Sequence, residues 1–307
     1  MIRIGLVFTY NLHYCRGVLR GIKRYAEGRP EWTLLLLGPE AKALKDLRVF
    51  RPAGVIAYIF REGLRKALAG LRRPLVNVCG VLPNLDIPRV GVDNVLVGRL
   101  AAEHLLERGL RHFAYVGHAR HAYSLEREDG FRQALDAMGY SLASNHECGS
   151  APFDPMGHPG ALDRHLSRWL SALPKPVGIF ACNDPWGIQL AEACRQTRLR
   201  VPEDVALVGA LNDDLLCELA RPPLTSVIAP AEHVGYEGCG GRSWKTSSFA
   251  ARPRRGGTHQ PRSNGWIILM AAPAIAFASS ATRRCRASGF PLCSTSRPSY
   301  PARCQWS

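Results

Sequence analysis

The sequence predicts an α/β fold of two doubly wound parallel-sheet lobes, followed by an irregular or disordered C-terminal tail. Over residues 1–238, short apolar runs alternate with longer amphipathic stretches, which is typical of parallel strand-helix-strand units. Only a few residues separate successive elements, and such short connections favour a doubly wound arrangement. This part of the chain is also long enough for two lobes.

The apolar runs predict buried strands, and the amphipathic stretches predict helices. At 95–108, for example, apolar residues share one helical face and charged residues another, and Gly109 follows as a C-cap. The predicted strands lie at 2–9, 32–37, 54–58, 75–78, 113–116, 177–181 and 205–209. The predicted helices lie at 16–26, 95–108, 125–138, 161–172 and 185–198.

The first predicted strand begins at Ile2, which leaves no room for the basic stretch and apolar core of a signal peptide. The sequence therefore predicts a cytoplasmic location. In that compartment cysteines are expected to stay reduced. The cysteines of residues 1–238 are Cys15, Cys79, Cys148, Cys182, Cys194 and Cys217.

The net charge of +15 belongs mostly to the end of the chain. Residues 239–307 contain eleven basic residues and no Asp or Glu, whereas residues 1–238 carry 29 basic residues and all 25 acidic ones. A basic segment can bind nucleic acid by neutralising phosphates. The apolar run at 266–278 has 13 residues, which is too short to span a membrane.

The composition of residues 239–307 favours an out-of-frame sequence, appended to a domain that is cut off partway through its last helix. Abundant Arg, Pro, Ser, Gly and Cys without acidic residues is typical of a shifted reading of a GC-rich gene. The alternative is a genuine basic tail that stays disordered until it meets a partner. The sequence thus divides into a two-lobed domain at 1–238 and an irregular tail at 239–307.

Five short motifs lie at the ends of predicted strands, where open α/β sheets bind ligands. They are GVDN at 91–94, SLEREDGF at 124–131, FACND at 180–184, RVPEDVALVG at 200–209 and RPPLTSV at 221–227. In this order they resemble the effector-binding core of the LacI/GalR family, which implies a type I periplasmic-binding-protein-like fold for residues 1–238. One subgroup, the xylose operon regulators, is similar in three further segments. These are FTYN at 8–11, EREDGFR at 126–132 and LCELARPP at 216–223.

The resemblance implies a sugar-sensing, DNA-binding transcriptional regulator of a carbohydrate operon. In the subgroup a sugar-binding core precedes a C-terminal AraC-type helix-turn-helix pair, and no such pair is recognisable at 239–307. The implied partners are a sugar effector, with a pentose such as xylose favoured, operator DNA for an intact family member, and a second copy of the chain in a homodimer. No membrane partner is implied. The alternative is a free-standing cytoplasmic sugar-binding module without a DNA role.

The resemblance places Arg127 and Asn183 at positions that contact the ligand. Sugar hydroxyls both donate and accept hydrogen bonds, so guanidinium, amide and carboxylate groups suit them. The alternative for Arg127 is a surface ion pair with Glu126 or Glu128. The alternative for Asn183 is capping the helix that begins near Asp184, for which Asn is equally suited.

Further ligand candidates are Tyr10, Asn11 and Tyr14 after the first strand, with core packing as the alternative for the aromatic rings. The family usually carries an acid two positions after the glycine that ends the strand at 205–209. This chain has Leu211 there, and a loop shift would bring Asp213 into the role. Loss of one charge-assisted hydrogen bond costs roughly 1.5 to 3 kcal/mol, which lowers affinity about ten-fold or more.

No motif indicates an enzyme, a metal site or a cofactor. The NHEC run at 145–148 lacks the second histidine of the helical metal motif, and the sequence contains neither a phosphate loop nor a Gly-x-Ser-x-Gly elbow. His112, His118 and His121 straddle a strand end, where exposed loop histidines are expected. Cys182 lies within a predicted strand and is expected to be a small buried apolar residue rather than a nucleophile.

Overall fold

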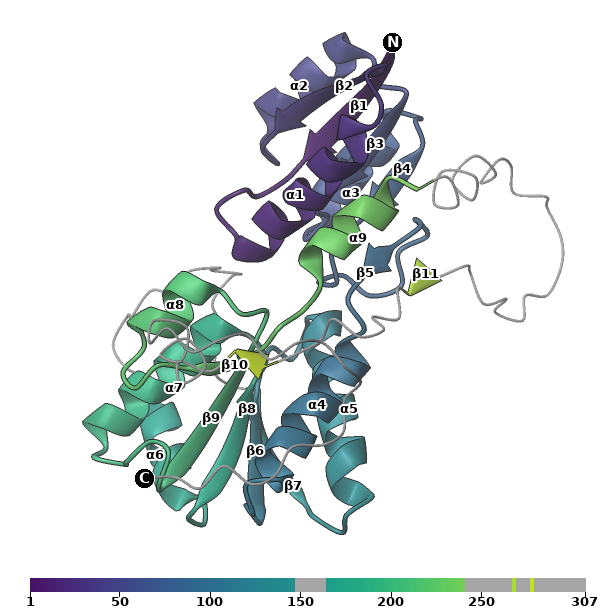
Figure 1. Cartoon of the computed structure of the whole chain (residues 1–307). Helices are drawn as coiled ribbons and strands as arrows, with labels where there is room; N and C mark the ends of the chain where they lie inside the picture. Colours follow the sequence, from purple (N-terminus) through teal and green to yellow (C-terminus); the bar gives the residue numbers. More distant parts are fainter. Residues whose placement is uncertain (147–163, 241–266, 269–276, 279–307) are drawn as a thin grey trace, which may run out of the picture.

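In the computed structural model the described residues are 1–146, 164–240, 267–268 and 277–278, and they form two α/β lobes (Figure 1). The first lobe contains a four-stranded parallel sheet of order β2-β1-β3-β4. Its strands are β1 (Ile2–Val7), β2 (Trp32–Leu37), β3 (Gly54–Ala57) and β4 (Leu75–Asn77). The helices that connect them are α1 (His13–Glu27), α2 (Ala41–Phe50) and α3 (Glu62–Ala69). Strand β3 is buried along its whole length, as expected of a central parallel strand.

The second lobe contains a six-stranded sheet of order β12-β10-β9-β8-β6-β7, in which only β12 runs antiparallel to its neighbour. Its strands are β6 (His112–Val116), β7 (Leu142–Asn145), β8 (Val177–Ala181), β9 (Val205–Ala210), β10 (Thr225–Val227) and β12 (Phe277–Ala278). Its helices are α4 (Asn94–Leu106), α5 (Ala122–Asp136), α6 (Arg164–Ala172), α7 (Asp184–Gln196) and α8 (Asp214–Leu219). The short strand β5 (Val90–Gly91) precedes α4 and pairs with β11 (Ile267–Ile268).

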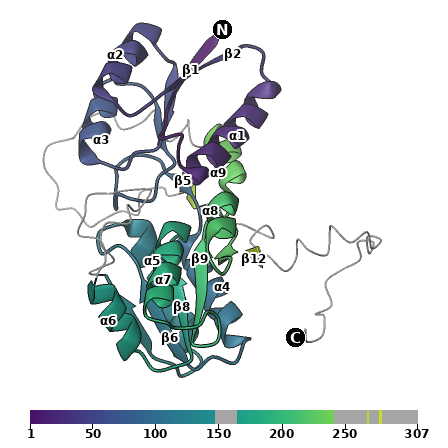
Figure 2. The ribbon, with the colours of Figure 1, turned by 90° about the vertical axis from the view of Figure 1, so that its left-hand side faces the viewer.

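After β10 the chain returns to the first lobe, where α9 (Ala231–Gly238) lies side by side with α1 (Figures 1 and 2). Two glycines allow the helix backbones to touch. A Cβ placed on Gly21 would lie 1.8 Å from the carbonyl oxygen of Glu232, and one on Gly235 would lie 1.9 Å from that of Val18. The first lobe is therefore built from both ends of residues 1–238.

The predicted fold of two parallel-sheet α/β lobes is confirmed. Each predicted strand and helix is present among the described residues, with bounds that differ by at most three residues. The sequence patterns missed α2, α3, β5, β7, α8, β10, β11 and β12, which are short or bury few side chains, and the last two lie in the predicted irregular tail. Apart from residues 239–240, β11 and β12, the predicted tail lies outside the described residues, as does Cys148. The other cysteines predicted to be reduced are buried and free.

Candidate functional site

A cavity of about 130 Å³ lies between the two lobes, at the carboxyl ends of strands from both sheets. Both lobes contribute polar side chains to its wall. They are Asn11, His13, Tyr14, Tyr58, Arg89, Asn94, Tyr123, Arg127, Asn183, Asp184 and Asp213. Apolar side chains complete the wall, among them Leu12, Val92, Pro185, Leu211 and Leu216. Such a mixture of apolar surface and a few converging polar groups is typical of a small-molecule site.

The guanidinium of Arg127 is held inside the cavity wall. The side chain is only 2% exposed. Its Nε donates to Oδ1 of Asn94 at 3.0 Å, its Nη1 donates to the carbonyl oxygen of Cys182, and its Cζ lies 5.1 Å from the ring centroid of Tyr123. Arg127 therefore occupies a fixed position where a ligand could meet it.

The acidic neighbours of Arg127 pair with other cations. Glu126 accepts hydrogen bonds from Arg89 at 3.2 Å and from Nδ2 of Asn94 at 2.7 Å. Glu128 pairs with Arg132 at 2.6 Å. The alternative of a surface ion pair for Arg127 is therefore wrong, because both carboxylates are taken and Arg127 is buried.

Asn183 combines the two placements that the sequence left open, as the cap of a helix and as a side chain of the cavity wall. Its Oδ1 accepts the backbone N–H of Trp186 at 3.1 Å and so caps α7, while its Nδ2 donates to Oη of Tyr123 at 3.2 Å. The same side chain lines the cavity. A helix cap at a strand end is well suited to this double placement, because the cap residue stands at the edge of the sheet where the cavity lies.

Two of the histidines after β6 are not the exposed loop residues that the sequence predicts. His118 and His121 are half-buried and pack against each other with ring centroids 4.3 Å apart, whereas His112 is exposed. Nε2 of His118 accepts the indole N–H of Trp186 at 3.0 Å. Burial, with a smaller contribution from His121, lowers the pKa of His118 to about 4, so the ring is neutral at pH 7. Packing around Trp186 explains the difference from the prediction.

Asp184, the first residue of α7, is a buried acid in the cavity wall, with 1% of its surface exposed. Its Oδ2 accepts the backbone N–H of Asp213 at 2.7 Å, and its Oδ1 accepts the hydroxyl of Ser226 at 2.6 Å. Burial raises the pKa of Asp184 to about 7, although both hydrogen bonds oppose the shift. The carboxyl group therefore changes its charge near neutral pH.

The turn between β9 and α8 brings both Leu211 and Asp213 to the cavity. Leu211 has φ 94° and Asn212 has φ 50°, so both adopt the left-handed region. Asp213 caps α8, because its Oδ1 accepts the N–H of Leu216 at 3.4 Å. The expectation that Asp213 is near the site agrees with its position in the wall, next to the apolar side chain of Leu211.

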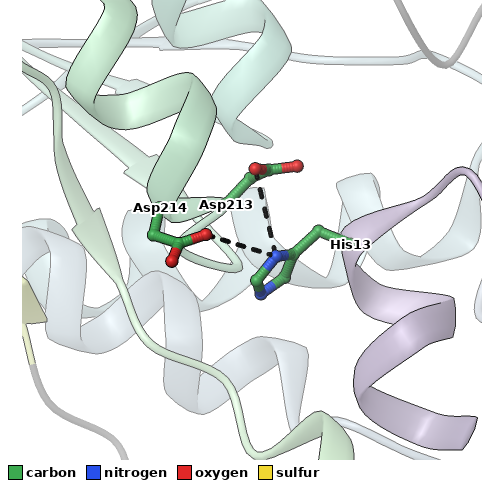
Figure 3. A group of neighbouring side chains, drawn as sticks. All are labelled: His13, Asp213 and Asp214. Atoms are coloured by element: carbon green, nitrogen blue, oxygen red, sulfur yellow. Dashed lines mark ion pairs between the residues drawn. The ribbon is translucent and has the colours of Figure 1, made fainter.

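The same turn meets the first lobe at the start of α1. Nδ1 of His13 lies 3.9 Å from an oxygen of Asp213 and 3.9 Å from one of Asp214 (Figure 3). These distances are too long for hydrogen bonds. Ligand atoms of the three side chains lie within 4.8 Å of one another, so among the described residues this group could hold a metal ion. The carboxylates, however, already accept the amides of Leu216 and Leu215, which explains their arrangement without a metal.

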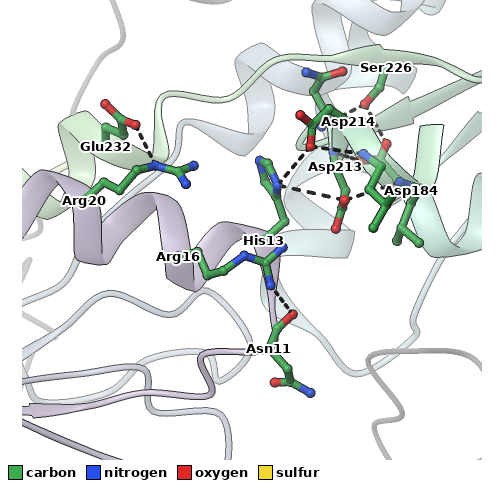
Figure 4. A network of polar contacts seen from close by, with 12 residues as sticks. Asn11, His13, Arg16, Arg20, Asp184, Asp213, Asp214, Ser226 and Glu232 are labelled. Carbon is green, nitrogen blue, oxygen red and sulfur yellow. Dashed lines mark hydrogen bonds and ion pairs between the residues drawn. The ribbon is translucent and has the colours of Figure 1, made fainter. Parts of the chain in front are cut away.

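Further polar contacts surround the lobe boundary. Figure 4 shows Arg16 donating to the carbonyl oxygen of Asn11 at 2.6 Å, and Arg20 of α1 pairing with Glu232 of α9 at 2.9 Å. The contact between His13 and the two aspartates thus lies beside the packing of α1 on α9. A ligand that moves one lobe against the other would change this boundary.

The thiols near the cavity are poor nucleophiles. Burial raises the pKa of Cys79 and that of Cys182 to about 12, so both are protonated at neutral pH. Cys182 directly follows β8 and is fully buried, as the sequence predicts. Burial also raises the pKa of Tyr14, whose hydroxyl donates to the carbonyl oxygen of Val78 at 2.9 Å. These groups are arranged for packing and hydrogen bonding rather than for covalent chemistry.

Of the six ligand candidates from the sequence, the structure brings five to the cavity. They are Asn11, Tyr14, Arg127, Asn183 and Asp213. Tyr10 does not line the cavity, and 60% of its surface is exposed. Sequence reasoning missed His13, Tyr58, Arg89, Asn94, Tyr123 and Asp184. Asn94 and Asp184 end the motifs GVDN and FACND, so a strand-end position was the available signal for them.

Comparisons with known proteins find similar sequences and structures. Residues 102–239 match the family described as periplasmic binding protein-like domain. The xylose operon regulatory protein of Escherichia coli strain K12 is 28% identical over 243 residues, and that of Haemophilus influenzae is 26% identical over 243 residues. The match to the Escherichia coli protein covers 76% of this chain. It covers 61% of the relative, so the chain spans less than two thirds of its length.

Solved structures are also similar to this chain. The xylose-binding transcription activator XylR has a TM-score of 0.67 and 27% identity, with 82% of this chain and 64% of that chain covered. The complex of the transcriptional regulator CelR with cellobiose has a TM-score of 0.60 and 25% identity, with 76% and 75% covered. Both similarities extend across the two lobes. Within the described part of the chain, the helices are too short or too polar to cross a membrane.

Proposed function

Because the chain contains a periplasmic-binding-protein-like domain, we propose that it is the sugar-sensing core of a cytoplasmic transcription regulator of a carbohydrate operon, and not an enzyme. The observation that carries this proposal is the cavity, to which both lobes contribute hydrogen-bonding side chains. A sugar in this cavity contacts both lobes at once, so it stabilises one arrangement of the lobes over others. A regulator that acts as a homodimer would pass this change to its DNA-binding parts.

The proposed ligand is a single pentose, with D-xylose as the first candidate. A cavity of about 150 Å³ holds one benzene ring, so about 130 Å³ is a suitable size for one six-membered ring. The similarity to xylose operon regulators points to the same sugar class. We assign hydrogen bonds with the hydroxyls to Asn11, Arg127, Asn183 and Asp213, and contact with a C–H face of the ring to Tyr14.

Calorimetric titration of the full chain with D-xylose and with cellobiose tests the ligand. We expect saturable binding of D-xylose and none of the disaccharide. Asn11→Ala should weaken D-xylose binding about ten-fold, because a hydroxyl of the sugar loses a hydrogen-bond partner. Gln196→Ala removes an exposed amide at the C-terminal end of α7, away from the cavity, whose Nε2 donates to Glu192, and should leave the affinity unchanged. Absence of D-xylose binding would refute D-xylose as the ligand, and absence of arabinose and ribose binding as well would refute the pentose proposal.

A regulator and a free-standing sugar-binding module differ in DNA binding. We propose in addition that residues 239–307 are out of frame, a proposal supported by eleven basic and no acidic residues in that stretch. On this proposal the gene belongs to a regulator, but the present polypeptide does not bind an operator specifically. A gel shift of the intact chain on a xylose-type promoter, with and without D-xylose and with competitor DNA, should therefore show no specific complex.

Sequencing of the source DNA across codons 235 to 245 tests the shifted frame directly. We expect a missing or additional base whose repair restores acidic residues after Gly238. An intact frame, together with a specific and sugar-sensitive gel shift, would contradict the proposal and make the basic segment a genuine DNA-binding arm. An intact frame without DNA binding would instead favour the free-standing module.

A further inference from the structure

The turn between β9 and α8 has a backbone conformation that its own residues do not favour. Leu211 has φ 94°, a region that glycine adopts readily and leucine rarely. Asn212 follows at φ 50°, which asparagine tolerates better. A leucine remains in this region only where surrounding contacts hold it there. The turn must therefore be fixed by the structure beneath it.

Three hydrogen bonds fix consecutive amides of the turn. The N–H of Leu211 donates to the carbonyl oxygen of Val227 at 2.9 Å. The N–H of Asn212 donates to Oγ of Ser226 at 3.0 Å, and the N–H of Asp213 donates to Oδ2 of Asp184 at 2.7 Å. The two acceptor side chains are themselves joined, because the Ser226 hydroxyl donates to Oδ1 of Asp184 at 2.6 Å.

The Asp184–Ser226 pair is enclosed by the fold. Ser226 is fully buried in β10, and Asp184 is 1% exposed. A Cβ placed on Gly209, two residues before the turn, would lie 2.4 Å from Oδ1 of Asp184. Only glycine at this position leaves the carboxylate where it accepts both hydrogen bonds. The two side chains are therefore held in one arrangement, and their oxygen atoms fix the amides of the turn.

We propose that Asp184 and Ser226 are positioning residues of the sugar site, which hold residues 211–213 so that Leu211 lines the cavity and Asp213 meets His13 of the other lobe. This inference rests on the proposed sugar-binding function and deepens it. The same turn then lines the cavity through Leu211 and contacts the other lobe through Asp213. Loss of the pair would loosen both contacts together, even if Asp184 itself touches no hydroxyl.

Several groups set the protonation of Asp184. Burial and the charge of Asp213 raise its pKa, whereas the hydrogen bonds and Arg127 of α5 lower it. Cys217 of α8 lies next to it as a protonated thiol, since burial and the two aspartates raise the thiol pKa. The neutral acid still accepts the amide of Asp213 and can donate its O–H to Ser226. An asparagine at this position has the same acceptor and donor pattern, so Asp184→Asn should preserve the pair.

Hydrogen exchange of the ligand-free full chain tests the inference, followed by titration with D-xylose at pH 7.5. Asp184→Ala and Ser226→Ala should each raise the exchange rate of the amides of residues 212 and 213 at least about ten-fold, and weaken D-xylose binding about ten-fold. Asp184→Asn should keep both quantities within about three-fold of the wild type. Leu170→Ala, a core change in α6, is the control for a general loss of stability. It should not raise the exchange rate of these two amides more than that of other amides.

The outcomes separate this inference from the proposed function. Unchanged exchange in both alanine variants overturns the inference, whatever the sugar data show. Faster exchange with unchanged D-xylose affinity also overturns it, because the turn would then be irrelevant to the site. If the wild type binds no D-xylose, arabinose or ribose, the proposed function fails and the positioning role fails with it. If Asp184→Asn behaves like Asp184→Ala, the hydrogen-bond pattern argued above is wrong.

Discussion

Nε of Arg127 donates a hydrogen bond of 3.0 Å to Oδ1 of Asn94 and thereby joins α5 to α4 inside the cavity wall. Nδ2 of Asn94 in turn donates to Glu126 at 2.7 Å. The buried cation is thus held by an amide whose own orientation is fixed by a carboxylate. A guanidinium prepared in this way can bind a ligand without first losing side-chain freedom, which lowers the entropic cost of binding.

Arg127→Met should remove sugar binding and destabilise the domain. The methionine keeps the length of the side chain but leaves Oδ1 of Asn94 and the carbonyl oxygen of Cys182 without their buried donors. Each unsatisfied group costs about 1–3 kcal/mol, so we expect a loss of about 2–4 kcal/mol in the free energy of unfolding. Denaturant titration and calorimetry measure the two effects.

The matched control for this change is Arg99→Met on α4. Arg99 is exposed and pairs with Glu103 at 3.5 Å. Exposed pairs contribute little, so this variant should lose less than about 1 kcal/mol and bind sugar normally. Retained sugar affinity in Arg127→Met would show that Arg127 supports the fold but does not contact the ligand.

Gly235→Ala should destabilise the first lobe. The new Cβ would lie 1.9 Å from the carbonyl oxygen of Val18, and a helix backbone cannot give way as a flexible side chain can. Overpacking typically costs about 1–3 kcal/mol or more, so the melting temperature should fall by several degrees. Gly63→Ala in α3 is the control, because a Cβ there meets nothing within 4 Å and should stabilise the helix by about 0.5–1 kcal/mol. If Gly235→Ala melts at the same temperature as the wild type, α9 does not pack on α1.

The parts of the fold that the sequence predicted are those whose signal is local. The run of apolar residues in β8 marks a buried strand without reference to the rest of the chain. Helix α3 was missed because only Leu64 and Leu68 are buried along it, too few for a visible apolar face. Strand β5 has two residues and carries no period at all. Long elements with a buried face were therefore predictable, and short connecting ones were not.

Candidate site residues were predictable where a family motif or the end of a predicted strand marked them. From the residues alone, a surface ion pair was the commoner expectation for Arg127, and the position in the family motif favoured the cavity. The role of Asp184 depends on Ser226, which lies 42 residues further along the chain, and no local pattern joins the two. Similarly, Leu211 was recognised as an unusual residue in its motif, but its positive φ follows from hydrogen bonds made by β10. Contacts between residues far apart in the sequence leave no periodic pattern in it, so sequence patterns could not predict them.

Acid should weaken the domain through His118. The pKa of His118 is lowered to about 4 by burial, below the value of about 6.5 for an unfolded chain. The unfolded chain therefore binds the proton first, and stability present above pH 6.5 is lost as the pH falls toward 4. His118→Gln should retain an acceptor for the indole of Trp186 but cannot titrate. Denaturant titrations at pH 7, 5.5 and 4 should show the wild type losing stability faster than the variant; parallel losses would contradict this cause.

Leu211→Asp should increase the affinity for D-xylose about ten-fold or more. The apolar side chain lines the cavity next to Asp213, at a position where a carboxylate would form a charge-assisted hydrogen bond with a hydroxyl. Aspartate also tolerates the left-handed backbone better than leucine does. Asp184 and Asp213 oppose a third negative charge nearby, so the gain should be larger at pH 6, where Asp184 is mostly neutral. Leu211→Asn, with the same shape and no charge, is the control in calorimetric titrations at pH 6 and 8. Equal affinities of the two variants would show that the site does not lack an acid.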